Sequence, residues 1–370
     1  MFINGLVRDE KGEKMSKVKG NSVDPLDVME KHGTDALRFT LAALAAPGTD
    51  PSFGEARLLG YKAFVNKLWN ASRFVLMNLE AGETAASYDV ASLPLPSRWI
   101  LERLNAAVIE VDAALGAFRF DLAAHTVYHF LWDEFCDWYL EIAKPYLADP
   151  GQAPATRRVL LDTLETALRL LHPLMPFVTE EIWQRLPKDG GAPSIMVAAF
   201  PVARPETAAG TSVDMDQLIA LVTAIRTIRA TYEVEPRRPI DVKIAAPSGR
   251  ELILGHEALI RSLGRIRDLE IASEFAKAKG TIVQPVGVFE VHIPMAGLFD
   301  VAAETARLAK ESARIAAELE GLRKKLGNPQ FVERAKPEVV AECRQREMEL
   351  VAREQRIAVT LADLGAEAAG

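Results

Sequence analysis

Residues 130–147 read FLWDEFCDWYLEIAKPYL, and this stretch decides the kind of fold that the chain can adopt. Together with Val127, three residues before it, the stretch places apolar side chains at three- and four-residue intervals: Val127, Leu131, Phe135, Trp138 and Ile142. That interval matches one face of an α-helix, because successive turns bring such residues above one another. The pattern predicts a long amphipathic helix over about 121–146 that must pack against other helices.

Similar patterns occur on both sides of this stretch. Three more segments show helical periodicity: 53–79, 97–115 and 155–171. After the last of them, Pro173 and Pro176 break the helix, and Thr179 is a candidate cap for the next one. Several helices joined by short connections are typical of an antiparallel bundle. We therefore expect a helical domain over residues 48–200.

The first 47 residues are predicted to form a separate segment. Residues 2–7 are a short apolar run that could be a strand. Asp24 and Pro25 have the residue types preferred at a helix start, so a short helix should run to His32. A second helix should begin at Thr34 or Asp35 and end before Pro47.

The sequence changes character after residue 200. Residues 201–299 alternate between helical and strand-like patterns, which indicates a small α/β domain. Strands are expected near 240–246, 268–273 and 287–293, with helices over 215–231 and 251–263.

The last segment, 300–370, is rich in Ala, Glu, Arg and Leu. Its apolar residues follow two helical seams: Leu308, Ile315, Leu319, Leu322 and Leu326, then Val340, Val351, Ile357, Leu361 and Leu364. Gly327, Asn328 and Pro329 separate the seams, which predicts an antiparallel coiled coil. The whole chain is thus expected to be mainly α: an antiparallel helical bundle, a small α/β connector domain and a C-terminal coiled coil.

The overall composition limits the possible functions. The chain has 370 residues, 49% of them hydrophobic, and a formal net charge of -7. This acidic balance argues against a uniformly basic coat for nucleic acid, although a local basic patch can still bind phosphates. Two remote cysteines and the lack of a long apolar run favour a cytoplasmic protein without a membrane span. We predict no metal site in the protein, because only His125 and His129 show ligand-like spacing and no third ligand accompanies them.

The stretch GEKMSKVKGNSVDP, residues 12–25, gathers positive charge in one short loop, which we call the lysine loop. Lys14, Lys17 and Lys19 carry flexible ammonium donors, and the Ser16 hydroxyl can bind a phosphate oxygen. Such a loop suits a triphosphate. Taken alone, the same residues are also compatible with a solvated charged turn.

The joint pattern of KMSK, KGN and HGTDALRFTLA resembles the signature loop and following helices of class I aminoacyl-tRNA synthetases, with Val18 in place of the last serine of the KMSKS pattern. The resemblance implies an ATP site that includes Met15, with magnesium accompanying the nucleotide. It implies that Lys17 is the principal phosphate ligand, Lys14 an auxiliary one and Ser16 a hydrogen-bond partner.

Further likeness identifies the branch of this family. NKLWNASRFVL at 66–76, the stretch at 130–147 and LLHPLMPFVTEEIWQRLP at 170–187 resemble the anticodon-binding bundle of the valine, isoleucine and leucine synthetases. The C-terminal hairpin is similar to the tRNA-binding arm of valyl-tRNA synthetases, and two remote cysteines cannot supply the zinc module usual in the isoleucine enzyme. The likeness implies a monomer that acts on valine, ATP and tRNA(Val).

The RNA-binding residues are less well defined by the sequence. Most of the bundle's aromatic residues are predicted to be core: Phe130, Trp132, Phe135, Trp138 and Trp183. Basic residues along the hairpin alternate with glutamates, as on a solvated coiled coil. Only Arg323, Lys324 and Lys325 form a cluster without an intervening acid, and they are the candidate RNA-backbone contacts.

Two motifs expected of a whole synthetase do not occur here. The chain has no His-x-Gly-His loop before the lysine loop and no segment resembling an editing domain. The resemblance therefore implies a carboxy-terminal portion of the enzyme that is inactive alone. Three alternatives remain: a stand-alone tRNA-binding module, the equivalent part of isoleucyl-tRNA synthetase, and a purely structural coiled-coil protein.

Overall fold

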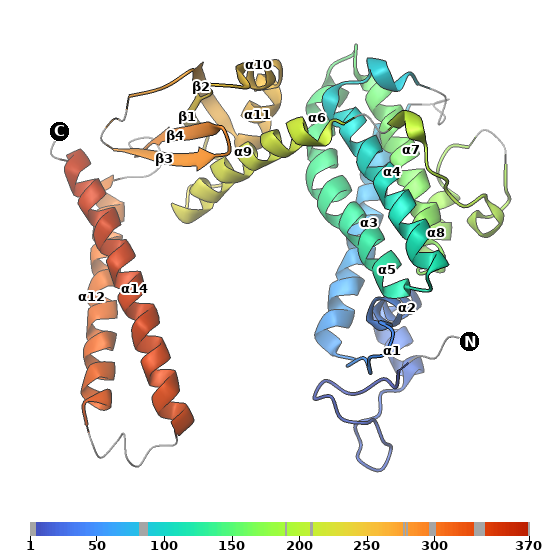
Figure 1. Cartoon of the computed structure of the whole chain (residues 1–370), viewed down its shortest axis with the longest axis horizontal. Coiled ribbons are helices and arrows are strands. Elements are labelled where there is room, and N and C mark those ends of the chain that lie inside the picture. Colours follow the sequence, from blue (N-terminus) through green and yellow to red (C-terminus); the bar gives the residue numbers. More distant parts are fainter. Residues whose placement is uncertain are drawn as a thin grey trace. The chain divides into compact units, whose positions relative to one another are not determined.

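The computed structural model describes residues 5–80, 88–188, 191–207, 210–276, 278, 280–295, 301–328 and 337–368. The chain divides into two compact units, Met1–Asp216 and Gln217–Gly370. Helices predominate, and one small four-stranded sheet lies in the second unit (Figure 1). The expected mainly α fold with a small α/β part is confirmed at this level.

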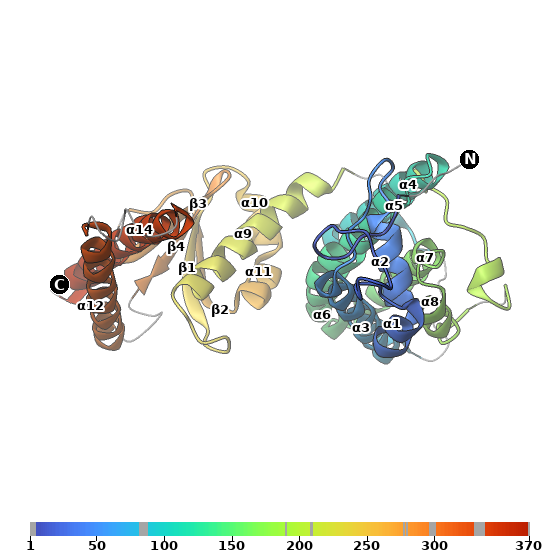
Figure 2. The same cartoon turned by 90° about the horizontal axis from the view of Figure 1, so that it is seen from below.

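The first unit is built from helices that pack side by side (Figure 2). Their bounds are α1 Pro25–His32, α2 Thr34–Leu44, α3 Glu55–Asn78, α4 Leu95–Gly116, α5 Phe120–His129, α6 Leu140–Ala148, α7 Ala153–Leu171 and α8 Pro176–Trp183. The core contains the apolar faces of α3, α4, α5 and α7, including Leu68, Ile100, Val127 and Leu164. The helices predicted from the sequence are therefore present, with ends shifted by a few residues at most.

The long helix predicted over 121–146 has an unexpected middle. Between α5 and α6, residues Phe130–Tyr139 form a π-helix, whose turns are wider than those of an α-helix. The wider turn keeps Leu131 and Phe135 buried and brings Tyr139 into the core. Trp138, which the 3.6-residue period predicts to be buried, is only half-buried for that reason.

The prediction that Thr179 caps α8 is wrong. Thr179 lies inside α8, fully buried, and its hydroxyl donates to the Met175 carbonyl at 2.7 Å. The N-terminus of α8 is instead capped by Asp35 of α2, whose carboxylate accepts from the Phe177 and Val178 amides at 3.2 and 2.6 Å. A cap from a remote helix leaves no local sequence signal.

The strand predicted for residues 2–7 is not present in residues 5–7, the part of this segment that the structure describes. Residues 2–4 lie outside the described ranges, and Gly5–Val7 belong to no strand. These residues run beside the turn at 49–52, where the Leu6 amide donates to Asp50 and the Arg8 amide to the Pro51 carbonyl. Contacts with a turn replace the sheet that an apolar run would otherwise need.

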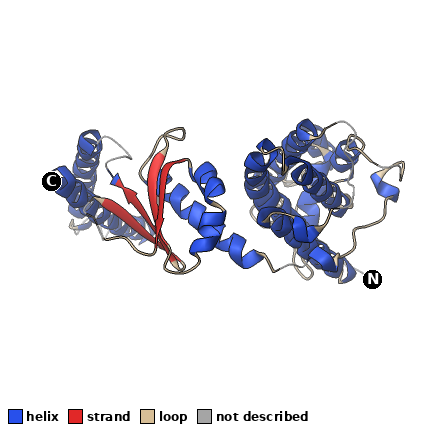
Figure 3. Ribbon diagram, turned by 90° about the horizontal axis from the view of Figure 1, so that it is seen from above, coloured by secondary structure: helices blue, strands red, loops and turns tan. Residues whose placement is uncertain are grey.

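The second unit contains most of α9 (Ser212–Thr231) and the sheet. Its further elements are β1 Ile240–Ala245, α10 Arg250–Gly255, α11 Glu257–Gly264, β2 Ile266–Ala272, β3 Thr281–Val286 and β4 Phe289–Pro294. The strand order is β2-β1-β4-β3, and only the β1–β2 pair is parallel. The helices α9, α10 and α11 cover one face of this sheet (Figure 3). The strand β3 was not predicted. It contains Pro285 and lies at the sheet edge, where proline is tolerated.

Two long helices follow, α12 (Val301–Leu326) and α14 (Pro337–Ala368). They pack along each other in opposite directions, as the ion pairs Glu311–Arg353 and Arg323–Glu347 require. Their shared core comprises Leu308, Ile315, Leu319, Leu350 and Ile357, with Leu322, Val351 and Leu361 beside it. The described residues of the predicted seam are thus buried or half-buried, whereas Pro329 and the side chain of Leu364 lie outside the described part.

Candidate functional site

The lysine loop is held in shape by one asparagine. The Asn21 carboxamide oxygen accepts the Ser16 amide at 2.8 Å, while its nitrogen donates to Asp9 at 2.8 Å and to the Lys14 carbonyl at 3.3 Å. Asp9 also accepts the amides of Lys11 and Glu13. These bonds, led by the one from Asn21, lower the pKa of Asp9. The loop therefore has a defined conformation.

The side chains of the KMSK stretch point in different directions. Met15 packs against an apolar cluster that includes Val28, Leu37 and Phe53. Lys14 and Lys17 are exposed, and neither forms an ion pair with any described residue. Half-buried Met15 thus anchors a loop whose two flanking ammonium groups are available for an anion.

The other members of the loop differ from this pair. Lys19 forms an ion pair with Glu13 at 3.4 Å. The Ser16 hydroxyl accepts the Val18 amide at 3.3 Å, which braces the turn, and the Val18 side chain is 98% exposed. Lys14 and Lys17, which have no acidic partner among the described residues, therefore differ from Lys19, which pairs with Glu13.

A pocket of about 400 Å³ lies beside the loop. Five carboxylates are among its lining residues: Asp9, Glu10, Asp24, Asp27 and Glu55. Three of them already hold backbone amides: Asp9 within the loop, Asp24 at the start of α1, and Glu10 through the Glu55 amide at 2.7 Å. Among the described residues no group of three or more His, Cys, Asp or Glu is arranged to hold a metal ion. These carboxylates consequently fit a role in shaping the loop better than a magnesium site.

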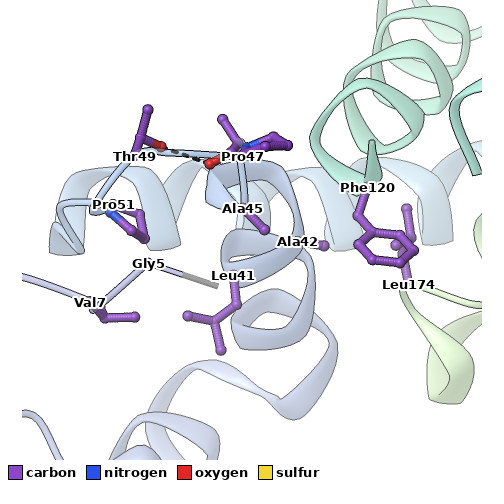
Figure 4. A pocket seen from close by; sticks show the side chains of 11 residues that line it. Gly5, Val7, Leu41, Ala42, Ala45, Pro47, Thr49, Pro51, Phe120 and Leu174 are labelled. Carbon is purple, nitrogen blue, oxygen red and sulfur yellow. Dashed lines mark hydrogen bonds between the residues drawn. The ribbon is translucent and has the colours of Figure 1, made fainter. Parts of the chain in front are cut away.

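A second pocket, of about 360 Å³, is apolar. Figure 4 shows Leu41, Ala45, Pro51, Phe120 and Leu174 around it. None of the lining residues in the described part of the chain is titratable, and the Thr49 hydroxyl among them donates to the Ala46 carbonyl at 2.9 Å.

The segment that carries the loop is fastened to the turn between α7 and α8. Asp35 caps α8 as described, and Arg38 donates to the carbonyls of Pro173 and Leu174 at 3.1 and 3.4 Å. Burial raises the pKa of Asp35, while the two amides that it accepts act in the opposite direction. Sequence reasoning did not identify this junction, because its partners are more than 130 residues apart.

The bundle's aromatic residues fall into two groups. Phe130, Phe135 and Trp183 are buried, as predicted. Trp132 is half-buried and stacks on Tyr128 with ring centroids 5.6 Å apart, and the Lys67 ammonium lies 3.7 Å from the Trp132 ring centroid. An ammonium over an indole is a cation–π contact, which stabilises this arrangement.

The predicted tip cluster is exposed at the end of α12, but its members differ. Arg323 donates to Glu347 of α14 at 3.0 Å and so helps to join the helices. Lys324 and Lys325 form no ion pair with a described residue. Farther along α12, Lys310 and Arg314 are likewise exposed and without an acidic partner in the described part.

The histidines with ligand-like spacing do not form a cluster of ligands. The rings of His125 and His129 have centroids 6.5 Å apart, and His129 contacts Asp133 at 2.8 Å. No described helix is long and apolar enough to span a membrane.

Comparison with known proteins places three family modules along the chain. Residues 1–53 match tRNA synthetases class I (I, L, M and V), residues 97–244 match the anticodon-binding domain of tRNA ligase, and residues 300–365 match the valyl tRNA synthetase tRNA binding arm.

Individual relatives point the same way. The chain is 46% identical to valine–tRNA ligase of Geobacter sulfurreducens and 43% identical to that of Syntrophotalea carbinolica, over 98% and 94% of its own length. It spans 41% and 39% of those relatives. The chain is also similar to a solved structure, the Agrobacterium radiobacter K84 LeuRS-tRNA-LeuAMS complex. The match covers 56% of this chain and 24% of the chain in that structure, with 21% sequence identity and a TM-score of 0.45.

The order of the modules and the identity to the relatives lead to one assignment. The class I segment, the anticodon-binding segment and the arm follow one another as in the sequence-based expectation. The chain therefore belongs to the valyl-tRNA synthetase family, of whose members it spans about two fifths.

Proposed function

We propose that this chain supplies the ATP-phosphate loop and the tRNA-binding surfaces of a valine–tRNA ligase, an enzyme that activates valine with ATP and transfers it to tRNA(Val). The observation that supports this most directly is the loop. Met15 anchors it, Asn21 fixes its shape, and the Lys14 and Lys17 ammonium groups remain available.

The proposed chemistry of the loop is electrostatic. When the valine carboxylate attacks the α-phosphate, negative charge grows on the departing pyrophosphate, and a nearby ammonium group lowers the free energy of that transition state. Lys17 is assigned as the principal phosphate ligand and Lys14 as the auxiliary one. The bound Ser16 hydroxyl keeps the turn closed between them. Magnesium would arrive with the nucleotide, since three of the five nearby carboxylates are engaged with backbone amides.

The remaining segments are assigned to tRNA. Residues 48–200 form the antiparallel helical bundle that binds the anticodon arm, 201–299 the connector domain, and 300–370 an antiparallel coiled-coil arm. Residues 1–47 complete the catalytic domain. Arg323, Lys324 and Lys325 are assigned to the RNA backbone, and the protein acts as a monomer in the cytoplasm.

Reconstitution tests this proposal. The 370-residue chain alone should show no valine-dependent ATP–pyrophosphate exchange. Adding the amino-terminal three fifths of the Geobacter sulfurreducens relative, expressed separately, should restore exchange and aminoacylation of tRNA(Val). Exchange by the chain alone would contradict the assignment.

A stand-alone tRNA-binding module is the second candidate. Val18, exposed where the family pattern has serine, favours it, because a lost hydroxyl suggests relaxed demands on the loop. In that case tRNA binding would persist while the reconstituted mixture stayed inactive.

A further inference from the structure

The basic residues of α12 are distributed unequally around the helix. Successive turns of an α-helix place residues three, four and seven apart on one face. By this spacing, the side of α12 facing away from its buried seam carries Lys310, Arg314, Ala317, Gly321 and Lys324, all of them exposed. We call these five residues the outer strip. Lys325 lies beside the strip at the same end.

The acids of α12 do not neutralise the outer strip. Glu311 and Glu318 point to α14, where they pair with Arg353 and Arg346. Among the described α12 acids only Glu320 has no ion pair. In α14 the described charges are mixed, with exposed Glu342 and Arg344 two residues apart. Among the described residues of the arm, most of the positive charge without an ion pair therefore lies on one side of α12, and Arg344 of α14 is outside it.

Folding alone does not account for the outer strip. Lys310 and Arg314 are one turn apart, and like charges at that spacing destabilise a helix by a few tenths of a kcal/mol. Gly321 sits in a helix interior, where glycine is about 1 kcal/mol less favourable than alanine. A Cβ added at Gly321 would meet nothing within 4 Å, so no neighbour requires its absence.

We propose that the outer strip of α12 is the face of the arm that lies along the RNA backbone. The proposal rests on the assignment of this segment as a tRNA-binding arm. It adds Lys310 and Arg314 to the RNA-contacting residues, whereas Arg323, which pairs with Glu347, lies outside the strip. Ala317 and Gly321, small and exposed between the charges, let a sugar–phosphate chain approach the helix closely.

The dimensions suit such a contact. From Lys310 to Lys324 the helix rises about 21 Å at 1.5 Å per residue. That length spans several phosphates of one strand. Each ammonium or guanidinium group that neutralises a phosphate releases counterions, and the binding constant then depends steeply on salt.

The test uses three variants of the 370-residue chain and in vitro transcribed tRNA(Val). The double variant Lys310→Gln/Arg314→Gln should bind about tenfold more weakly near 0.1 M salt, with a slope of log K against log salt smaller by about 1.5. Its melting temperature should be unchanged or slightly higher, since a like-charge pair is gone. Gly321→Gln should also weaken binding without lowering the melting temperature.

The matched control is Arg344→Gln on α14, which removes an exposed charge that is not on the strip. It should leave affinity and salt slope unchanged. Equal losses in Arg344→Gln and in the double variant would overturn the proposal, as would unchanged binding by the double variant. If the unmodified chain binds no tRNA at all, the underlying assignment of the arm fails instead.

Discussion

At the scale of residues, the lysine loop shows which features a sequence can reveal. Lys14, Ser16 and Lys17 were predicted as site residues because a local charge pattern resembles a family motif, and both the pattern and the motif are local properties of the chain. Asn21 and Asp9 were missed, although they determine the loop conformation, because side-chain-to-backbone bonds across a loop leave no periodic pattern. The ion pair of Arg323 illustrates the same limit, because its partner Glu347 lies on another helix and no local pattern links the two residues.

The first prediction concerns Asn21. Replacing Asn21 by Ala removes the acceptor of the Ser16 amide, so hydrogen exchange at Ser16 should accelerate at least about tenfold while global stability falls by about 1 kcal/mol or less. Val18→Ala is the control, because Val18 is almost fully exposed. Unchanged protection of the Ser16 amide in Asn21→Ala would show that the loop is held in another way.

A second prediction separates two lysines of the same loop. In the reconstituted enzyme, Lys17→Ala should lower kcat for pyrophosphate exchange by about 10²-fold or more, as removal of a transition-state charge contact does. Lys19→Ala should have a much smaller effect, because Lys19 pairs with Glu13. Steady-state kinetics of both variants, with KM and kcat determined separately, decide the point. Equal effects would remove the special role of Lys17.

At the scale of elements, helices were predicted well and their junctions were not. Periodicity finds an amphipathic helix, but the π turn at Phe130–Tyr139 changes the period itself and so moves Trp138 out of its predicted place. The cap of α8 shows the same difficulty. The preference of helix starts for threonine predicted Thr179 as the cap, whereas in the folded chain the carboxylate of Asp35 in α2 caps α8.

The remote cap supplies a third prediction. Asp35→Ala should destabilise the chain by about 1–2 kcal/mol in urea unfolding, since two amides at the start of α8 lose their acceptor. Asp24→Ala, which removes the exposed cap of α1, is the matched control and should cost less. A smaller loss from Asp35→Ala than from Asp24→Ala would argue against the proposed importance of this junction.

His172 in the same region gives a prediction about pH. Burial lowers the pKa of His172 below its ordinary 6.5. The Thr179 hydroxyl donates its proton to Met175, so His172 must donate from Nδ1 to Thr179. Because the unfolded chain binds the second proton more readily, stability should fall as pH decreases through 6.5. Between about pH 7.5 and 5.5 the melting temperature should fall less in His172→Gln than in the unmodified chain. Equal decreases in the two chains would show that His172 is not the group responsible.

At the scale of the whole molecule, the sequence predicts in which order the segments follow one another. Local sequence patterns do not determine the residues at which one segment ends and the next begins. Composition separates the helical, mixed and hairpin segments, and the chain folds into two compact units that meet in sequence near Asp216. The hairpin seam was found from heptad-like spacing alone, although Leu350 was missed and its neighbour Val351 was chosen for the seam.

The hairpin's ion pairs should contribute little to stability. A double-mutant cycle on Glu311 and Arg353 is expected to give a coupling of about 0.2–1 kcal/mol that decreases as salt rises, because Arg353 is half-exposed. Thermal unfolding in low and high salt measures it. A large, salt-independent coupling would mean that the pair, rather than the apolar seam, holds the helices together.

The central claim is that exposed cations on an otherwise acidic chain bind tRNA(Val). The most direct measurement is equilibrium binding of tRNA(Val) to the 370-residue chain across a series of salt concentrations. We predict that log K falls linearly with log salt, with a slope of about -2 or steeper, and that an unrelated tRNA binds more weakly. Binding that is absent at low salt, or that does not change with salt, would contradict the account.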